Sequence, residues 1–115
     1  MKIFGLLVVM AAAFAVAYPI ATSAQLSWYP IGDPMNEPHV QELGAWAVAE
    51  HVKQVHDGIK FSKVVSGEEQ SDAGVKYHLI IEALNSGGEQ GRYEAILIEE
   101  VRSYTRTLIS FSPAK

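Results

Sequence analysis

The chain has 115 residues, and its 9 Lys and Arg against 13 Asp and Glu give a formal net charge of −4. Hydrophobic residues make up 49% and charged residues 19%, which is typical of one globular domain and excludes a disordered chain. Without a basic excess to neutralise phosphates, no nucleic-acid partner is expected. The chain has no cysteine, which excludes disulfides and thiolate metal sites, and its 4 histidines are scattered, so we expect no metal centre and no cofactor.

The first residues have the pattern of an export signal. Met1 and Lys2 form a short basic start, residues 3–17 are an unbroken apolar run, and small residues follow Pro19 up to Ala24. An uncleaved membrane anchor is the alternative, but Pro19 interrupts a stretch that needs about 20 apolar residues to span a bilayer. Export is therefore favoured.

We expect a signal peptide over residues 1–24, with cleavage after Ala24, and a mature domain over residues 25–115. Cleavage after Ala17 is the second candidate. The exported domain is expected in the extracellular space or apoplast, with the vacuole as an alternative, and without a membrane partner once the signal is removed.

Apolar residues recur at three- and four-residue steps after Pro38, which is the spacing of one helix face: Val40, Leu43, Ala47, Val48, His51 and Val55. The pattern predicts a helix of about 20 residues, roughly 30 Å long, that ends near Asp57 and Gly58. Gly44 lies inside this helix, where glycine costs about 1 kcal/mol relative to alanine. We expect Gly44 to permit close approach to a neighbouring backbone.

Four later segments are rich in residues that favour strands: residues 59–65, 75–82, 92–99 and 107–111. Their short links predict an antiparallel meander, because parallel strands need crossovers of a dozen or more residues. One face of such a sheet has to be covered, and the helix is the only available cover. The sequence therefore predicts an α+β fold.

Three smaller features of this region have plain structural interpretations. Ser66 and Gly67 are expected in a turn after the first strand, and residues 85–91 in a loop. The acidic pairs at residues 68–69 and 99–100 are expected on solvated faces.

The sequence contains no recognisable catalytic constellation. His51 and His56 are five residues apart and do not share a helix face, and Glu50 and His51 point roughly 100° apart on a helix. Neither a serine-nucleophile motif nor a phosphate-binding glycine loop is present. We therefore expect a protein that is not an enzyme.

Residues 43–51, which read Leu-Gly-Ala-Trp-Ala-Val-Ala-Glu-His, resemble the helix signature of the plant cystatins, or phytocystatins. That family's pattern reads roughly Leu-Ala-Arg-Phe-Ala-Val-x-Glu-His-Asn. Similarity continues upstream in residues 28–31 and 38–42, and downstream in residues 77–79, 93–95 and 108–111. The resemblance implies a cystatin-like fold, with a four- to five-stranded antiparallel sheet wrapped around one long helix.

Membership would imply a thiol protease inhibitor whose partners are papain-like cysteine proteases. Inhibitors of this family fill the active-site cleft with a reversible wedge made of an N-terminal glycine trunk and two hairpin turns. The likeness places the first hairpin on Gln70, Ser71, Asp72, Ala73 and Gly74, the second on Val101 and Arg102, and the trunk on Leu26 and Ser27.

The three contact elements depart from the family pattern. Ser71 and Asp72 lie in a motif that normally reads Gln-x-Val-x-Gly, where Gly74 also suits any tight turn. Val101 and Arg102 replace a Pro-Trp pair, and Leu26 and Ser27 replace paired glycines. An unpaired buried carboxylate costs several kcal/mol and a lost aromatic anchor about 2 kcal/mol, so weak inhibition is expected.

A second interpretation is a non-inhibitory module that keeps the cystatin fold and binds another protein. The retained Gln70, Ala73 and Gly74 favour the inhibitor, whereas the substituted contact elements favour the module. In either case a monomer is expected, with a domain-swapped dimer as the alternative.

Overall fold

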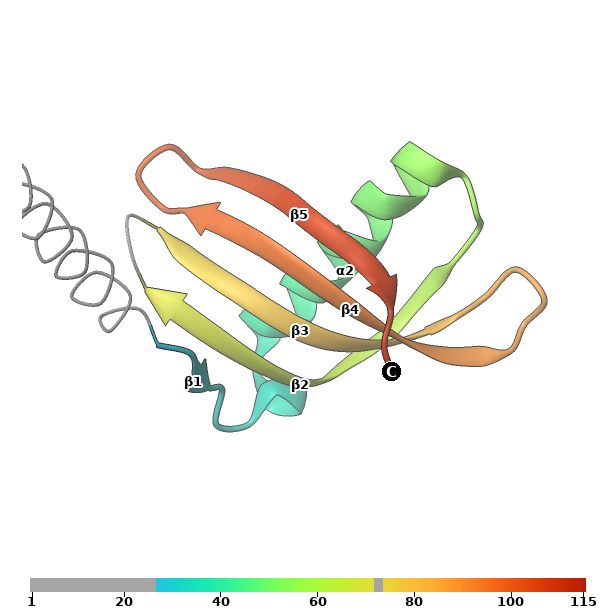
Figure 1. Cartoon of the computed structure of the whole chain (residues 1–115), viewed down its shortest axis with the longest axis horizontal. Helices are drawn as coiled ribbons and strands as arrows, with labels where there is room; N and C mark the ends of the chain where they lie inside the picture. Colours follow the sequence, from blue (N-terminus) through green and yellow to red (C-terminus); the bar gives the residue numbers. More distant parts are fainter. Residues whose placement is uncertain (1–26, 72–73) are drawn as a thin grey trace, which may run out of the picture.

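The computed structural model describes residues 27–71 and 74–115. Seven elements follow one another in the chain: β1 (Tyr29–Pro30), η1 (Pro34–Asn36), α2 (Pro38–Val55), β2 (Lys60–Ser71), β3 (Val75–Leu84), β4 (Gln90–Glu100) and β5 (Thr105–Pro113). The strands form one antiparallel sheet in the order β1-β2-β3-β4-β5, and α2 crosses one face of it (Figure 1). This arrangement confirms the expected α+β fold. The expected signal peptide lies outside the described residues.

Helix α2 begins at Pro38, where the missing N–H of proline costs no helical hydrogen bond. It ends at Val55, two residues before the expected stop, because His56 itself adopts the left-handed conformation with φ of 59°. The His56 N–H donates to the carbonyl oxygen of Val52 at 2.8 Å and closes the last turn. Among the described residues, no helix is long and apolar enough to cross a membrane.

The core lies between α2 and the inner face of the sheet. Its fully covered side chains come from the helix and from three neighbouring strands: Leu43, Ala47, Val64, Leu79, Ile81, Ala83, Ala95 and Leu97. These residues alternate along β3 and β4 as a half-buried sheet requires. Burying a Leu or Ile side chain of this kind contributes about 1.5–3 kcal/mol, so this alternation sets the register of the central strands.

Gly44 brings the helix close to β2. A Cβ atom at Gly44 would lie 2.3 Å from Cγ2 of Val64 and 3.0 Å from Cε1 of Phe61. The close approach expected for Gly44 is therefore confirmed, although its neighbours are side chains of β2 rather than backbone. A larger residue would push the helix off the sheet.

Strand β2 continues well past the predicted turn at Ser66 and Gly67, and it ends at Ser71. Gly67 is a strand residue whose missing side chain makes room for Leu79 and Ile31, because a Cβ there would lie 2.8 Å from Cδ2 of Leu79. Shifts in register between Val64 and Ser66 bend β2 at this point. The composition of this segment predicted a turn at Gly67. In the structure Gly67 lies inside a strand, because the neighbouring side chains leave no room for a larger residue.

The outer edge of β2 is covered by a side chain as well as by β1. The amide of Gln41 donates from Nε2 to the carbonyl oxygen of Val64 at 3.0 Å, and its Oε1 accepts from the Val64 N–H at 3.0 Å. Gln41 Nε2 also donates to the carbonyl oxygen of Pro34 at 2.8 Å. Gln41 thus satisfies an edge backbone pair in the way that another strand would.

Candidate functional site

Three separate parts of the chain meet at one end of the domain (Figure 1, left). They are the residues that lead into β1, the adjoining ends of β2 and β3, and the turn at residues 101–104 between β4 and β5. We call this region the docking end and define it by Ser27, Trp28, Gln70, Ser71, Gly74 and residues 101–104. Leu26, Asp72 and Ala73, which the family likeness also assigns to contacts, lie outside the described residues.

Strands β2 and β3 pair up to Ser71 opposite Val75, with Gln70 opposite Lys76. Gly74 lies in the connection between these two strands, just before β3, and approaches the end of β4, since a Cβ there would lie 2.7 Å from the Glu99 carbonyl oxygen. Close backbone approach therefore gives Gly74 a structural reason of its own, beside the tight-turn interpretation.

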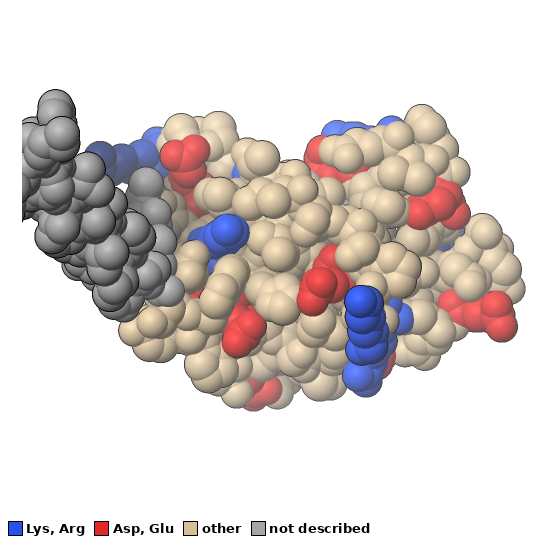
Figure 2. Space-filling model, viewed as in Figure 1, with Lys and Arg blue, Asp and Glu red and all other residues tan. Residues whose placement is uncertain are grey.

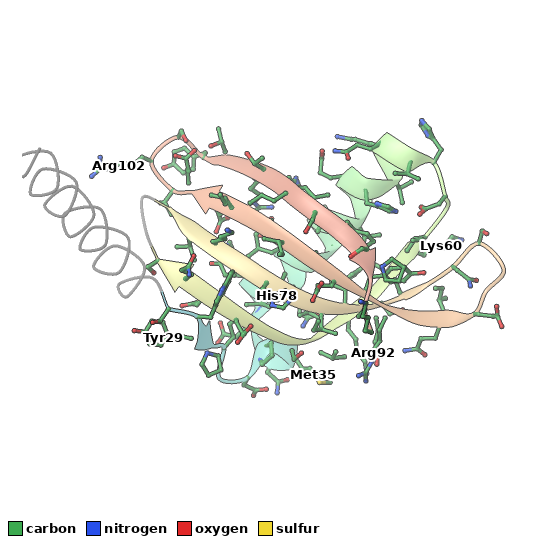
Figure 3. The ribbon with its side chains drawn as sticks, viewed as in Figure 1. Tyr29, Met35, Lys60, His78, Arg92 and Arg102 are labelled. Atoms are coloured by element: carbon green, nitrogen blue, oxygen red, sulfur yellow. The ribbon has the colours of Figure 1, made fainter. Side chains whose placement is uncertain are left out.

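The turn between β4 and β5 exposes two apolar side chains. Val101 is 66% exposed and Tyr104 is 91% exposed, and Arg102 projects away from the domain (Figure 3). The family likeness assigns contacts to Val101 and Arg102 but not to Tyr104. The sequence signal that could have identified Tyr104 is an aromatic residue in a turn, two positions after Arg102.

Tyr104 has a positive φ of 53°. A non-glycine residue in this conformation costs of order 1–3 kcal/mol and persists only where the surroundings impose it. The turn is closed by a hydrogen bond of 2.8 Å between the hydroxyls of Ser103 and Thr105. The aromatic ring is thus presented to solvent on a constrained backbone.

A charged cluster joins this turn to the helix. Glu99 is bound by His39 at 2.7 Å and accepts from Arg106 Nε at 3.2 Å, while Arg106 Nη2 donates to Glu42 at 3.0 Å. The Arg106 guanidinium also lies 5.9 Å from the ring centroid of Trp46. The expectation that Glu99 lies on a solvated face is wrong, because its side chain is only 14% exposed.

This cluster forms part of the wall of a groove of about 730 Å³ between α2 and the β4–β5 turn, and Val101 and Tyr104 also line it. The ion pairs of this cluster connect α2, β4 and β5 beside the groove. They therefore hold the β4–β5 turn in a fixed position. Rigid presentation lowers the entropy lost when a surface binds.

Trp28, which precedes β1, packs against His78, which lies on the face of the sheet turned toward the viewer in Figure 3. Trp28 packs edge-on against His78, with ring centroids 5.9 Å apart and planes at 64°, and Lys76 Nζ lies 5.9 Å from the Trp28 ring centroid. His78 in turn contacts two carboxylates, Glu68 at 3.1 Å and Glu94 at 2.7 Å. Glu68 therefore takes part in a cross-strand network. The expectation that residues 68–69 form a simple solvated pair did not include this network.

The pKa of His78 reflects this network. Burial favours the neutral ring, but hydrogen bonds to Glu94 and Glu68 outweigh that effect and raise the pKa above its ordinary value. The protonated ring is thus the form that these two carboxylates stabilise.

The other histidines do not form a site with this region. His51 lies at the opposite end of α2, 2.6 Å from Asp57 and stacked on Phe111 with ring centroids 4.2 Å apart. In residues 27–71 and 74–115, no three His, Asp or Glu side chains gather as a metal site would require. Charged side chains are interspersed over the face seen in Figure 2, without a broad patch of one sign.

Comparisons with known proteins agree on an inhibitor family. A family model described as "Aspartic acid proteinase inhibitor" matches residues 33–114. Cysteine proteinase inhibitor 8 of Oryza sativa subsp. japonica is 42% identical over 87 residues, covering 76% of this chain and 70% of the relative. Cysteine proteinase inhibitor 5 of Arabidopsis thaliana is 35% identical over 112 residues, covering 97% and 91%.

The fold is also similar to that of a salivary cystatin from the soft tick Ornithodoros moubata. The TM-score is 0.66 at 16% identity, over 78% of this chain and 98% of that one. The family description names aspartic proteinases and the relatives' names give cysteine proteinases, but all are inhibitors and not enzymes. With the helix signature, the five-stranded sheet and these relatives in agreement, this chain belongs to the plant cystatin family of proteinase inhibitors.

Proposed function

We propose that this protein is a secreted inhibitor of papain-like cysteine proteases and that its docking end enters the active-site cleft as a reversible wedge. The observation that supports this most is that the residues leading into β1, the end of β2 and the β4–β5 turn come from distant parts of the sequence to one end of the domain (Figure 1). The relatives named as cysteine proteinase inhibitors supply the target class. Preformed turns lose little conformational entropy on binding, which suits an inhibitor that blocks a cleft without being cleaved.

The contacts of this wedge are weaker than the family pattern provides. Ser71 and Asp72 make the first hairpin polar, and a carboxylate carried into a cleft costs several kcal/mol unless it stays hydrated or meets a cation. Val101 and Arg102 stand where a Pro-Trp pair is usual. We propose that the exposed ring of Tyr104 restores part of the missing aromatic contact. Micromolar inhibition of papain is the expected outcome.

Titration of papain with protein that starts at Gln25 tests the proposal. This protein keeps every described core residue, all of which lie between Val40 and Leu97. A micromolar inhibition constant supports both the activity and its weakening. A subnanomolar constant refutes the weakening, and absence of inhibition at 100-fold higher concentration than expected refutes the inhibitor.

An aspartic proteinase is the second candidate target, because the matching family model is described by that class. Pepsin is therefore titrated in the same series. Stronger inhibition of pepsin than of papain would move the assignment to aspartic proteinases. A pull-down with and without a covalent cysteine-protease blocker separates the inhibitor of cysteine proteases from the non-inhibitory module, which would keep its partners after blocking.

The leader and the site of export belong to the same proposal. Residues 1–24 are proposed as the signal peptide and residues 25–115 as the mature domain. Mass spectrometry of the protein secreted by plant cells would show a first residue of Gln25, or of Tyr18 for the alternative cleavage. An unprocessed chain in the membrane fraction would contradict secretion.

A further inference from the structure

We propose that His78 is a positioning residue that holds Trp28, and with it Ser27 and the start of β1, against the sheet at the docking end. This inference rests on the proposed function, because it assigns His78 an indirect part in inhibition. His78 itself lies in the middle of β3 and not in the docking end.

The backbone alone attaches β1 weakly. The strand has only 2 residues, Tyr29 opposite Glu69 and Pro30 opposite Glu68. Pro30 has no N–H to donate, and the next backbone bond runs from the Ile31 N–H to the Gly67 carbonyl oxygen at 2.9 Å. Ser27 and Trp28, the described residues before Tyr29, therefore depend on side-chain contacts for their position.

Trp28 supplies these contacts. Trp28 precedes β1 and is 36% exposed, and its ring packs against His78 on the outer face of the sheet. His78 is in edge contact with its ring and Lys76 lies over it. A large, rigid ring with a cation above it and a histidine beside it is held at two points.

His78 is itself held by both ring nitrogens. Nδ1 lies 3.1 Å from Glu68 on β2 and Nε2 lies 2.7 Å from Glu94 on β4. The network thus spans three strands and determines which way the His78 ring faces. Two ring nitrogens that contact two carboxylates are both satisfied as donors when the ring is protonated.

The charged groups around His78 are few. Glu68 comes from β2, Glu94 from β4 and Lys76 from β3, while β5 places the uncharged Ser110 and Ser112 opposite this part of β4. The two carboxylates favour a protonated His78, and its raised pKa agrees with this. Trp28 is therefore held more tightly at mildly acidic pH, and the hold weakens as the pH rises through the pKa of His78 in the folded protein.

The test measures the position of Trp28 and protease inhibition separately. A Trp46→Phe background leaves Trp28 as the single tryptophan, and iodide quenching of its fluorescence reports its exposure. His78→Ala is expected to increase quenching and to raise the inhibition constant for papain about tenfold, the scale of a coupling between residues in contact. Ile80→Ala is the matched control, since it removes a half-buried side chain from the same face of β3.

Two further variants show whether His78 acts through Trp28. In a Trp28→Ala background, His78→Ala is expected to leave the inhibition constant unchanged, because the ring that it holds is gone. His78→Gln keeps hydrogen bonding but cannot titrate, so its quenching is expected to be independent of pH between 5 and 8, unlike that of the parent protein.

The possible results are distinguishable. If the parent protein fails to inhibit papain, the proposed function fails, whereas quenching still tests the positioning. Unchanged quenching in His78→Ala, or equal losses of inhibition with and without Trp28, would overturn the role of His78. The same increase of quenching in Ile80→Ala would also overturn it, because general loosening of the sheet would then explain the effect.

Discussion

Gly74 and Glu99 are in backbone contact: a Cβ atom on Gly74 would lie 2.7 Å from the carbonyl oxygen of Glu99. Gly74 ends the connection between β2 and β3, and Glu99 lies in the last part of β4. The two hairpins of the docking end are thus in direct contact. They can lie this close because Gly74 has no side chain.

Gly74→Ala is therefore expected to push the hairpins apart. Overpacking of this kind costs about 1–3 kcal/mol, and the displaced turn is expected to weaken papain inhibition as well. Urea denaturation and the inhibition constant measure the two effects. Gly32→Ala is the matched control, because a Cβ at Gly32 would meet nothing within 4 Å and its φ is not positive. Equal effects of both variants would contradict the close approach.

Tyr104→Ala is expected to weaken inhibition without destabilising the fold. The ring is 91% exposed, so its removal uncovers no core, but the loss of an aromatic anchor costs about 2 kcal/mol, close to thirtyfold in affinity. Tyr104→Gly is expected to lose the same affinity and to gain up to about 1 kcal/mol in stability, because glycine tolerates positive φ. Met35→Ala removes another exposed apolar side chain, away from the docking end, as the control. An inhibition constant for Tyr104→Ala equal to that of the control would show that Tyr104 makes no contact.

Arg106→Met is expected to destabilise the protein by about 1–3 kcal/mol. The substitution keeps much of the apolar stem but removes the donors to Glu99 and Glu42 and leaves Glu99, 14% exposed, with His39 alone. Lys53→Met breaks a pair with Glu50 whose lysine is 74% exposed, and its effect is expected to stay within about 0.5 kcal/mol. Urea unfolding at neutral pH compares the two, and similar losses would contradict the structural role of Arg106.

The lowered pKa of Asp57 leads us to expect a loss of folding stability at low pH. Slight burial would raise its pKa, but hydrogen bonds from His51 and from the Ile59 N–H prevail and lower the pKa below its ordinary value. A group with a lowered folded-state pKa stabilises the fold above its unfolded pKa, and this contribution disappears as pH falls through the folded value. His51→Phe keeps a ring to stack on Phe111 but removes the donor. It is expected to flatten the stability curve below pH 4 in urea titrations, and an unchanged slope would contradict the assignment.

The helix and the central strands could be predicted because their signals are local. Val40, Leu43 and Ala47 recur at the helical period, and the alternation in β3 is complete within ten residues. Gly67 shows where such reasoning fails. A glycine after a strand suggests a turn, but whether it ends the strand depends on which side chains lie across from it, and these belong to β3 and to the lead-in.

The sequence by itself determined that one amphipathic helix covers an antiparallel sheet, since hydrophobic periodicity requires no knowledge of distant residues. It also determined the family, because the helix signature is continuous in the chain. Only the tertiary structure decided that Gly74 touches Glu99, that Tyr104 is the exposed ring of the second turn, and that His78 lies against Trp28. These relationships depend on strand register and on the bend of β2, which place residues dozens of positions apart within a few ångströms of each other.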